Sequence, residues 1–211
     1  LPGYVVVVLI MQLLWWFGIH GPNVMSAVTT PFMTKMMATN LELYQAGEGV
    51  TASGVFYTAG SKYSIIANPF GSGWFSSTGS GITMGLIVAI MLFSKRDDFK
   101  AIAKLAIPCG IFNINEPIIF GIPMVMNAMF AVPFFLAPVA CICCGYLVQS
   151  LGLCPLFVID VPWTTPVGLF GFLASSGNIM GGIWQIVIIV GVSTLIYTPF
   201  VIAANRQGAE A

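Results

Sequence analysis

The chain has 211 residues, of which 58% are hydrophobic and 7% are charged, and its seven basic and seven acidic residues give a net charge of zero. Soluble domains carry about 25% charged residues, so this chain lacks the polar exterior that a soluble protein with a large core needs. The basic residues form no long run, which argues against nucleic acid as a partner. We therefore expect an all-α, polytopic membrane protein with spanning helices, re-entrant or broken hairpins and an amphipathic interfacial helix.

The first apolar run covers residues 4–19, is interrupted by Gln12 and ends near His20. It is slightly short of the ~20 residues that a spanning helix needs. It also lacks a basic flank and a small-residue cleavage site, so it is not a signal peptide. We expect the chain to be the interior of a longer protein, whose preceding sequence completes this span. Residues 23–62 are more polar and predict an interfacial helix or loop region, with methionines that serve packing.

Residues 63–81 are dense in Gly, Ser and Asn, and an apolar helix is predicted to follow over residues 82–93. An interrupted segment that leads into a short apolar helix is typical of a re-entrant hairpin or broken helix in a transporter. An extramembrane loop would have a similar composition. We favour the re-entrant interpretation.

One charged cluster follows this apolar helix, and it holds four of the seven basic residues: Lys95, Arg96, Asp97, Asp98, Lys100 and Lys104. The positive-inside rule places such a loop in the cytoplasm. Phe99, Ile102, Ala103 and Ala106 have the spacing of one helix face. We interpret this segment as an amphipathic helix on the membrane surface.

Residues 108–151 are apolar and interrupted by prolines at positions 108, 117, 123, 133 and 138. A re-entrant element is predicted around Asn115-Glu116-Pro117, followed by a spanning helix over residues 130–148. After a Gly- and Pro-rich stretch at 152–182, a second span is predicted over 183–204. Two crossings after the charged loop return the C-terminus to the cytoplasm, in agreement with Arg206.

Glu116 is the most informative residue, because from position 105 to position 205 only Glu116 and Asp160 are charged. A carboxylate at bilayer depth costs between ~3 and more than 10 kcal/mol, so it indicates a functional site. Pro117 and Pro123 interrupt the backbone here, and irregular backbone within a membrane must be buried in protein or line a cavity. Asp160, close to Pro162, is expected to be a loop or cap residue outside the site.

Aromatic side chains and hydrogen-bonding groups recur near these interruptions, at Trp15, His20, Asn115, Glu116 and Trp163. A sugar packs its C–H faces on aromatic rings and needs polar groups to replace water at its hydroxyls. Each residue alone also has a structural interpretation: a packing histidine, an interfacial tryptophan, or a Glu116 salt bridge with His20. The five cysteines lie in apolar stretches without a second histidine, so neither a metal, a cofactor nor a disulfide framework is expected.

Three motifs together resemble a known family: residues 17–21 (FGIHG), 115–123 (NEPIIFGIP) and 162–168 (PWTTPVG). They are similar to the signatures of enzyme IIC, the membrane subunit of bacterial sugar phosphotransferase systems, in its lactose/cellobiose/diacetylchitobiose branch. The likeness extends through residues 195–200. Full members are about twice as long, and this chain resembles their C-terminal half. The resemblance thus implies that residues 1–211 are a substrate-carrying transport domain whose dimerising N-terminal half is absent.

The resemblance also implies a reaction. A disaccharide of the cellobiose, diacetylchitobiose or lactose type is carried across the membrane, and a cytosolic phospho-IIB subunit phosphorylates one of its hydroxyls. His20 and Glu116 would hydrogen-bond that hydroxyl and serve catalysis, Asn115 would bind another polar group, and Trp15 and Trp163 would pack on the rings. The implied setting is the bacterial inner membrane, in a homodimer surrounded by lipid, with the C-terminus in the cytoplasm.

Two other function classes stay open at this point. An ion-coupled secondary sugar transporter would use Glu116 as a proton site at a broken helix and would need no IIB subunit. In a non-transporting membrane subunit, Glu116 would be a structural residue. The bonding partners of Glu116 distinguish this last class from the other two.

Overall fold

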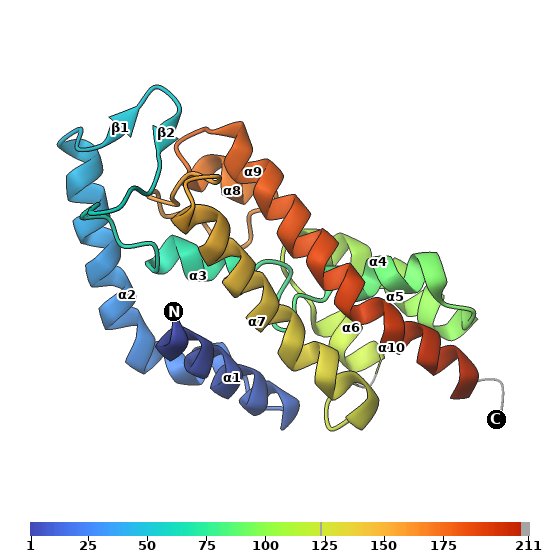
Figure 1. The fold of residues 1–211 in the computed structure, drawn as a ribbon. Helices are drawn as coiled ribbons and strands as arrows, with labels where there is room; N and C mark the ends of the chain where they lie inside the picture. Colours follow the sequence, from blue (N-terminus) through green and yellow to red (C-terminus); the bar gives the residue numbers. More distant parts are fainter. Residues whose placement is uncertain (123, 208–211) are drawn as a thin grey trace.

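The computed structural model describes residues 1–122 and 124–207 and is mostly helical (Figure 1). The first half contains α1 (Pro2–Trp16), α2 (Gly21–Gln45), the strands β1 (Val50–Thr51) and β2 (Gly54–Val55), α3 (Asn68–Trp74) and α4 (Met84–Phe93). The second half contains α5 (Asp97–Ile111), α6 (Glu116–Gly121), α7 (Ala128–Ser150), α8 (Leu169–Ala174), α9 (Ile179–Ile186), the π-helical turn η1 (Val187–Val192) and α10 (Ser193–Gln207). The all-α expectation is confirmed, apart from the antiparallel pair β1–β2. Pro123 lies outside the described residues.

Two helical stretches within the described chain are long and apolar enough to cross a bilayer. They are α7, with 23 residues, and the continuous run Ile179–Arg206 through α9, η1 and α10, with 28 residues. Both exceed the ~20 residues that span the hydrocarbon core. They correspond to the spans predicted at 130–148 and 183–204. By contrast, α1 is a shorter apolar helix of 15 residues, so a third full span stays an expectation.

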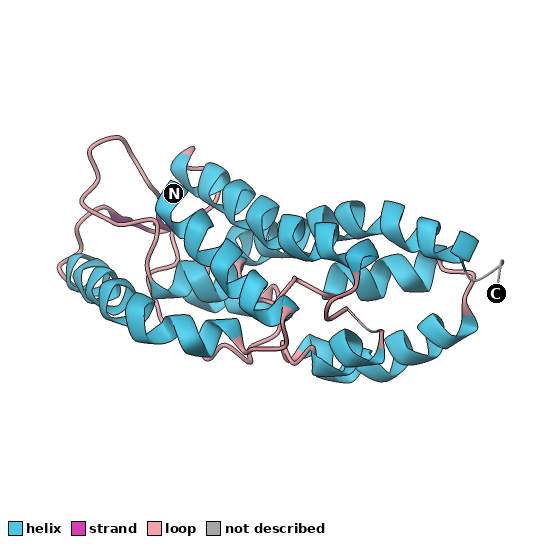
Figure 2. Cartoon of the chain, turned by 90° about the horizontal axis from the view of Figure 1, so that it is seen from below, coloured by secondary structure: helices cyan, strands magenta, loops and turns pink. Residues whose placement is uncertain are grey.

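The interrupted segment at 63–81 is largely buried inside the protein. Phe70, Trp74 and Ile82 are completely buried. Thr78 and Ile82 both have positive φ angles, which an α-helix does not allow. This is why α4 starts at Met84, two residues later than predicted. Figure 2 shows loop segments in the middle of the molecule, between the helices and not only at their outer ends.

Helix α5 turns its predicted apolar face towards the protein. Phe99, Ala103 and Ala106 are buried as the spacing indicates, but they belong to a core cluster with Leu86 and Ile119. Through this face the helix packs on α4 and α6. Apolar periodicity alone does not distinguish burial against lipid from burial against protein.

The end of α10 is bound to the charged loop between α4 and α5. Asn205 accepts a hydrogen bond from the Lys95 amide at 2.8 Å and donates one to the Phe93 carbonyl at 3.0 Å. The loop and the end of α10 therefore lie at the same end of the molecule (Figure 1). This agrees with placing both on one side of the membrane.

The region from residue 23 to residue 62, expected to be an interfacial helix or loop, is mostly one 25-residue helix, α2. Its first residue, Gly21, lies directly against α1, where a Cβ would be 2.0 Å from the Met11 carbonyl oxygen. Only glycine permits so close an approach of two backbones. The crossing of α1 and α2 brings Trp15 and His20 together at one point.

Candidate functional site

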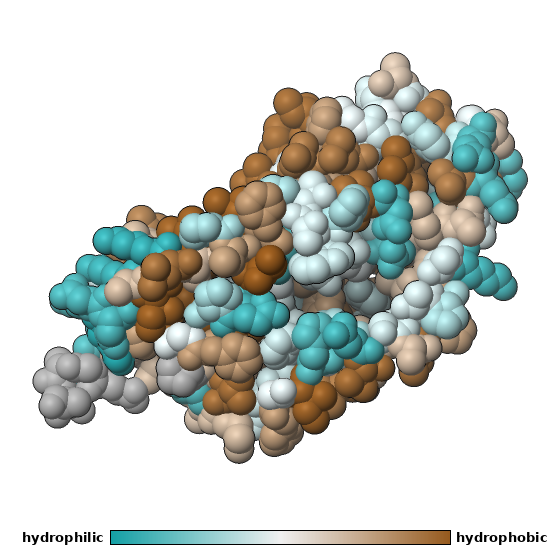
Figure 3. Space-filling view, turned by 180° about the vertical axis from the view of Figure 1, so that it is seen from behind, coloured by the Kyte–Doolittle hydropathy of each residue, from teal (hydrophilic) through white to brown (hydrophobic). Residues whose placement is uncertain are grey.

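The five residues singled out by sequence all line one cavity of about 800 Å³: Trp15, His20, Asn115, Glu116 and Trp163. They come from three distant parts of the chain, namely the α1–α2 junction, the break between α5 and α6, and the loop before α8. Figure 3 shows the face opposite to that of Figure 1, which is hollowed near its middle, where hydrophilic side chains gather between apolar ones. The volume lies in the range of small-molecule sites.

His20 is held in a defined orientation by the start of α2. Its side chain caps the helix, with Nδ1 accepting a hydrogen bond from the Asn23 amide at 3.2 Å. A neutral imidazole that accepts at Nδ1 carries its proton on Nε2. The His20 ring also lies 4.8 Å from the Trp15 ring, centroid to centroid. The site therefore has an exposed histidine with one N–H available to a ligand.

Glu116 is the first residue of α6, and Pro117 follows it in the first turn, where proline is favoured. Its side chain is exposed at the cavity. Within residues 1–122 and 124–207, its carboxylate makes no ion pair and no hydrogen bond. The structural salt bridge with His20 is thus not formed. Glu116 is a free acceptor in the wall of a cavity.

Asn115 has a positioning role that its place in the motif did not reveal. Its side chain is 4% exposed, and its Nδ2 donates to the Ser80 carbonyl at 2.6 Å. It packs directly over Gly79, where a Cβ would lie 2.2 Å from the Asn115 Cγ. One of the two amide N–H groups of Asn115, which was predicted to bind a polar group of the sugar, is therefore already bonded to the chain. Its Oδ1 and the second N–H of Nδ2 are left without a partner in the described residues.

Asn113 connects three loops and was missed by the sequence reasoning. Its Oδ1 accepts from the Thr78 amide at 2.7 Å. Its Nδ2 donates to the Trp163 carbonyl and, at 2.9 Å, to the Thr165 carbonyl. Its φ of 66° lies in the left-handed region, where Asn is enriched. The only sequence signal was the alternation of Asn113 and Asn115 before Glu116.

The two tryptophans differ in exposure. Trp15 is 5% exposed, and its Nε1 is buried without a hydrogen-bond partner in the described part of the chain. Trp163 is 56% exposed and is held through its carbonyl by Asn113. Asp160 accepts from Asn68 at 3.0 and 3.1 Å and does not line the cavity, as expected of a loop residue. Among the described residues no group of three or more His, Cys, Asp or Glu side chains could hold a metal.

We expect Asn113→Asp to destabilise the protein by about 3–5 kcal/mol. The Trp163 and Thr165 carbonyls would lose their hydrogen-bond donor and face a carboxylate, and each unsatisfied group costs ~1–3 kcal/mol. Thermal unfolding of the full-length protein checks this. Asn178→Asp is the control, since Asn178 caps α9 with Oδ1 and donates to the Ser53 carbonyl but is only partly buried and does not line the cavity. If the two variants unfold within about 0.5 kcal/mol of each other, Asn113 does not hold the loops together.

Comparison with known proteins gives consistent matches. The family described as "Phosphotransferase system, EIIC" matches residues 1–138. The chain is 36% identical over 212 residues to the "PTS system cellobiose-specific EIIC component" of Lactococcus lactis subsp. lactis (strain IL1403), covering 95% of this chain and 42% of that protein. It is 35% identical over 208 residues to the "PTS system oligo-beta-mannoside-specific EIIC component" of Bacillus subtilis (strain 168), covering 95% and 43%.

A solved structure has the same fold. The crystal structure of the transporter ChbC, the IIC component of the N,N'-diacetylchitobiose-specific phosphotransferase system, matches with a TM-score of 0.86 and 33% identity. The match covers 97% of this chain and 45% of ChbC. The chain thus spans less than half the length of each of these relatives.

Proposed function

The chain belongs to the phosphotransferase system EIIC family, and on this premise we propose that it is the substrate-carrying part of a sugar permease. The whole protein would carry a disaccharide across the bacterial inner membrane and present one hydroxyl to a phosphorylated, cytosolic IIB subunit. The single observation that supports this is the convergence of Trp15, His20, Asn115, Glu116 and Trp163 on one cavity.

The chemistry needs only a positioned alcohol and a proton acceptor. The sugar oxygen attacks the phosphorus of the IIB phosphocysteine, the P–S bond breaks, and the hydroxyl proton passes to the Glu116 carboxylate. The Nε2–H of His20 donates to the same sugar oxygen and orients it. Because Glu116 has no partner within the described residues, it can accept the proton without first breaking a bond within the chain.

The remaining parts of the site fit a neutral sugar. Trp15 and Trp163 offer aromatic surface to sugar C–H faces, and the buried Trp15 Nε1 is a free donor within the described residues. The relatives are named for cellobiose, oligo-beta-mannoside and diacetylchitobiose, which supports a substrate of this size and kind. We further propose that the missing N-terminal half makes the homodimer contacts, and that the charged loop and the C-terminus face the cytoplasm.

Reconstitution of the full-length parent protein distinguishes group translocation from ion coupling. With phosphorylated IIB inside the vesicles, we expect sugar phosphate to appear in the lumen, where the dianion is trapped. With unphosphorylated IIB as the control, no sugar should accumulate. Accumulation of free sugar above the external concentration, driven by a proton or sodium gradient without IIB, would overturn the assignment in favour of a secondary transporter.

A further inference from the structure

Gln185 is a buried amide in an apolar membrane span. It lies in α9, within the helical run Ile179–Arg206, and its side chain is completely buried. A buried amide destabilises a protein unless its polar atoms are hydrogen-bonded. Gln185 does not line the sugar cavity, so its presence in this span needs another explanation.

The side-chain oxygen of Gln185 caps the start of α8. The backbone amides of Gly168 and Gly171 donate to Oε1 at 2.8 and 2.7 Å. Gly168 is the N-cap residue of α8 and has no side chain that could bond the free amides of the first turn. Because α8 packs on α9, a side chain of α9 can supply this cap. The cap holds the end of residues 162–171, the tryptophan loop, which brings Trp163 to the cavity.

The side-chain nitrogen of Gln185 holds a second part of the cavity wall. Nε2 donates to the Gly73 carbonyl at 3.1 Å and to the Ser77 hydroxyl at 3.0 Å. Both residues belong to residues 72–80, the serine segment. Three residues of this segment line the cavity: Ser76, Gly79 and Ser80. An amide group has two acceptor positions and two N–H groups, so Gln185 uses its full capacity to connect the serine segment to the tryptophan loop.

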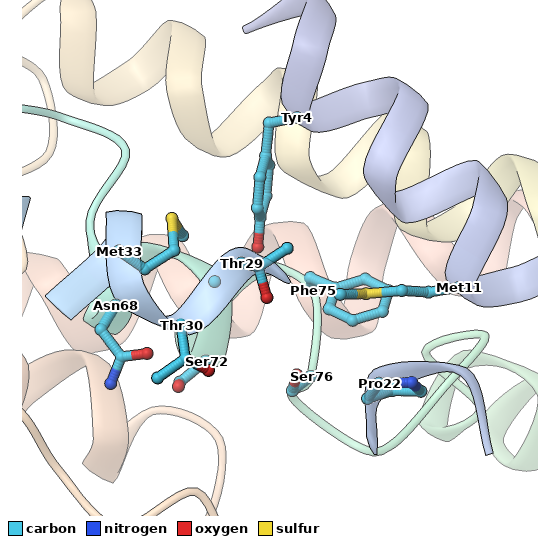
Figure 4. A pocket seen from close by; sticks show the side chains of 11 residues that line it. Tyr4, Met11, Pro22, Thr29, Thr30, Met33, Asn68, Ser72, Phe75 and Ser76 are labelled. Carbon is cyan, nitrogen blue, oxygen red and sulfur yellow. The ribbon is translucent and has the colours of Figure 1, made fainter. Parts of the chain in front are cut away.

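The serine segment borders open space in two places, which makes this connection important. Beside the sugar cavity lies a smaller space of about 140 Å³ between the segment and the helices α1 and α2 (Figure 4). Figure 4 shows Ser72, Phe75 and Ser76 at its edge. Ser76 also lines the sugar cavity. A chain segment has fewer packing contacts where it borders open space, so its position depends more on its hydrogen bonds.

Asn113 connects the same two parts of the chain at a second point, through Thr78 and Trp163. Two connections fix both the distance and the angle between two segments, whereas one would leave them free to rotate. We propose that Gln185 is a positioning residue for the sugar site, which together with Asn113 fixes the serine segment and the tryptophan loop relative to each other before the sugar binds. This inference rests on the proposed function. A preformed site binds more tightly, because the sugar does not have to order the cavity wall.

Two buried glutamines offer a matched pair of variants. Gln185→Met keeps the length of the side chain and removes all four hydrogen bonds. Gln149 in α7 is also buried, donates to the Pro155 carbonyl at 2.9 Å and accepts from Trp74 Nε1 at 3.4 Å. Gln149→Met therefore repeats the loss of buried hydrogen bonds but leaves the connection between the serine segment and the tryptophan loop intact.

Two buried serines offer a milder pair. The hydroxyls of Ser77 and Ser193 both donate to the carbonyl four residues earlier, and only that of Ser77 also accepts from Gln185. Ser77→Ala and Ser193→Ala therefore remove the same bond within a helix or turn. The difference between them is the bond to Gln185.

The measurement is the initial rate of IIB-dependent cellobiose phosphorylation by the full-length parent protein, together with its thermal unfolding. We expect Gln185→Met to raise the KM for cellobiose about tenfold. The kcat should stay within about threefold, because Glu116 and His20 lie on other segments. Gln149→Met should lower the unfolding temperature to a similar extent but leave KM within about twofold. Ser77→Ala should raise KM about two- to fivefold relative to Ser193→Ala, because one hydrogen bond is lost.

Other outcomes contradict the inference in different ways. If Gln185→Met and Gln149→Met have the same KM, Gln185 only stabilises the fold. If Gln185→Met lowers kcat and leaves KM unchanged, it does not position the cavity wall for the sugar. Should Gln185→Met fail to fold, the serine pair decides, and equal KM values for its two variants reject the inference. If the unaltered protein phosphorylates neither cellobiose, lactose nor diacetylchitobiose, the proposed function is wrong and this inference falls with it, which is seen before any variant is made.

Discussion

Replacing Glu116 with glutamine is expected to weaken sugar binding by about tenfold to a hundredfold and to reduce phosphorylation further. Glutamine keeps the size of the side chain, but it neither makes a charge-assisted hydrogen bond, which contributes ~1.5–3 kcal/mol, nor accepts a proton. Binding and IIB-dependent phosphorylation are measured on the same preparation of full-length protein. The loss of phosphorylation should exceed the loss of affinity, because the proton leaves the sugar only during the reaction.

Asp160→Asn is the matched control for this experiment. Asp160 is the other carboxylate between residues 105 and 205, but it contacts Asn68 and does not line the cavity. We expect it to leave sugar affinity within a factor of two. If Glu116→Gln also stays within a factor of two, Glu116 does not bind the ligand.

The second large effect is expected from Gly79→Ala, which should slow sugar phosphorylation by about a hundredfold and weaken sugar binding. An added Cβ would lie 2.2 Å from the Asn115 Cγ and would push this side chain off the Ser80 carbonyl. Glu116 is the next residue, so its carboxylate moves as well, and a misplacement of ~1 Å at a reacting group costs about 10² in rate. Binding and phosphorylation assays on the full-length protein check this.

Gly60→Ala is the control that distinguishes the steric clash with Asn115 from backbone strain. Both glycines have a positive φ, 79° at Gly79 and 87° at Gly60, but a Cβ at Gly60 would meet nothing within 4 Å. Because alanine is strained at a positive φ, each variant should lose roughly 1–2 kcal/mol of stability. Only Gly79→Ala should weaken sugar binding and slow phosphorylation. Equal binding by the two variants would show that the contact between Gly79 and Asn115 does not position the site.

Much of the fold could be predicted because a bilayer leaves few choices. Long apolar runs had to become α7 and the helix Ile179–Arg206, since backbone polar groups in lipid must be satisfied within the segment. The buried breaks near Thr78 and Asn113 follow from the same rule, because irregular backbone there needs protein around it. Whether the apolar face of α5 packs on lipid or on protein could not be decided in this way, since the same sequence pattern suits both.

The candidate site was predictable to the extent that charge and aromatic rings are rare in apolar sequence. Glu116 and His20 are conspicuous for that reason, and the structure places them in one cavity. Asn113 was missed because an asparagine with a structural role looks the same as one on a loop until its partners are known.

The bonds of Asn113 also bear on how sugar preference can diverge within such a family. A single side chain joins the turn at Thr78 to the loop at Trp163 and Thr165. An insertion or deletion in any one of these loops would shift the other two, so their lengths are constrained together. We therefore expect new specificities to arise by substitution of side chains on loops of unchanged length, or in α1 and α2, whose residues reach the cavity without being bonded to Asn113.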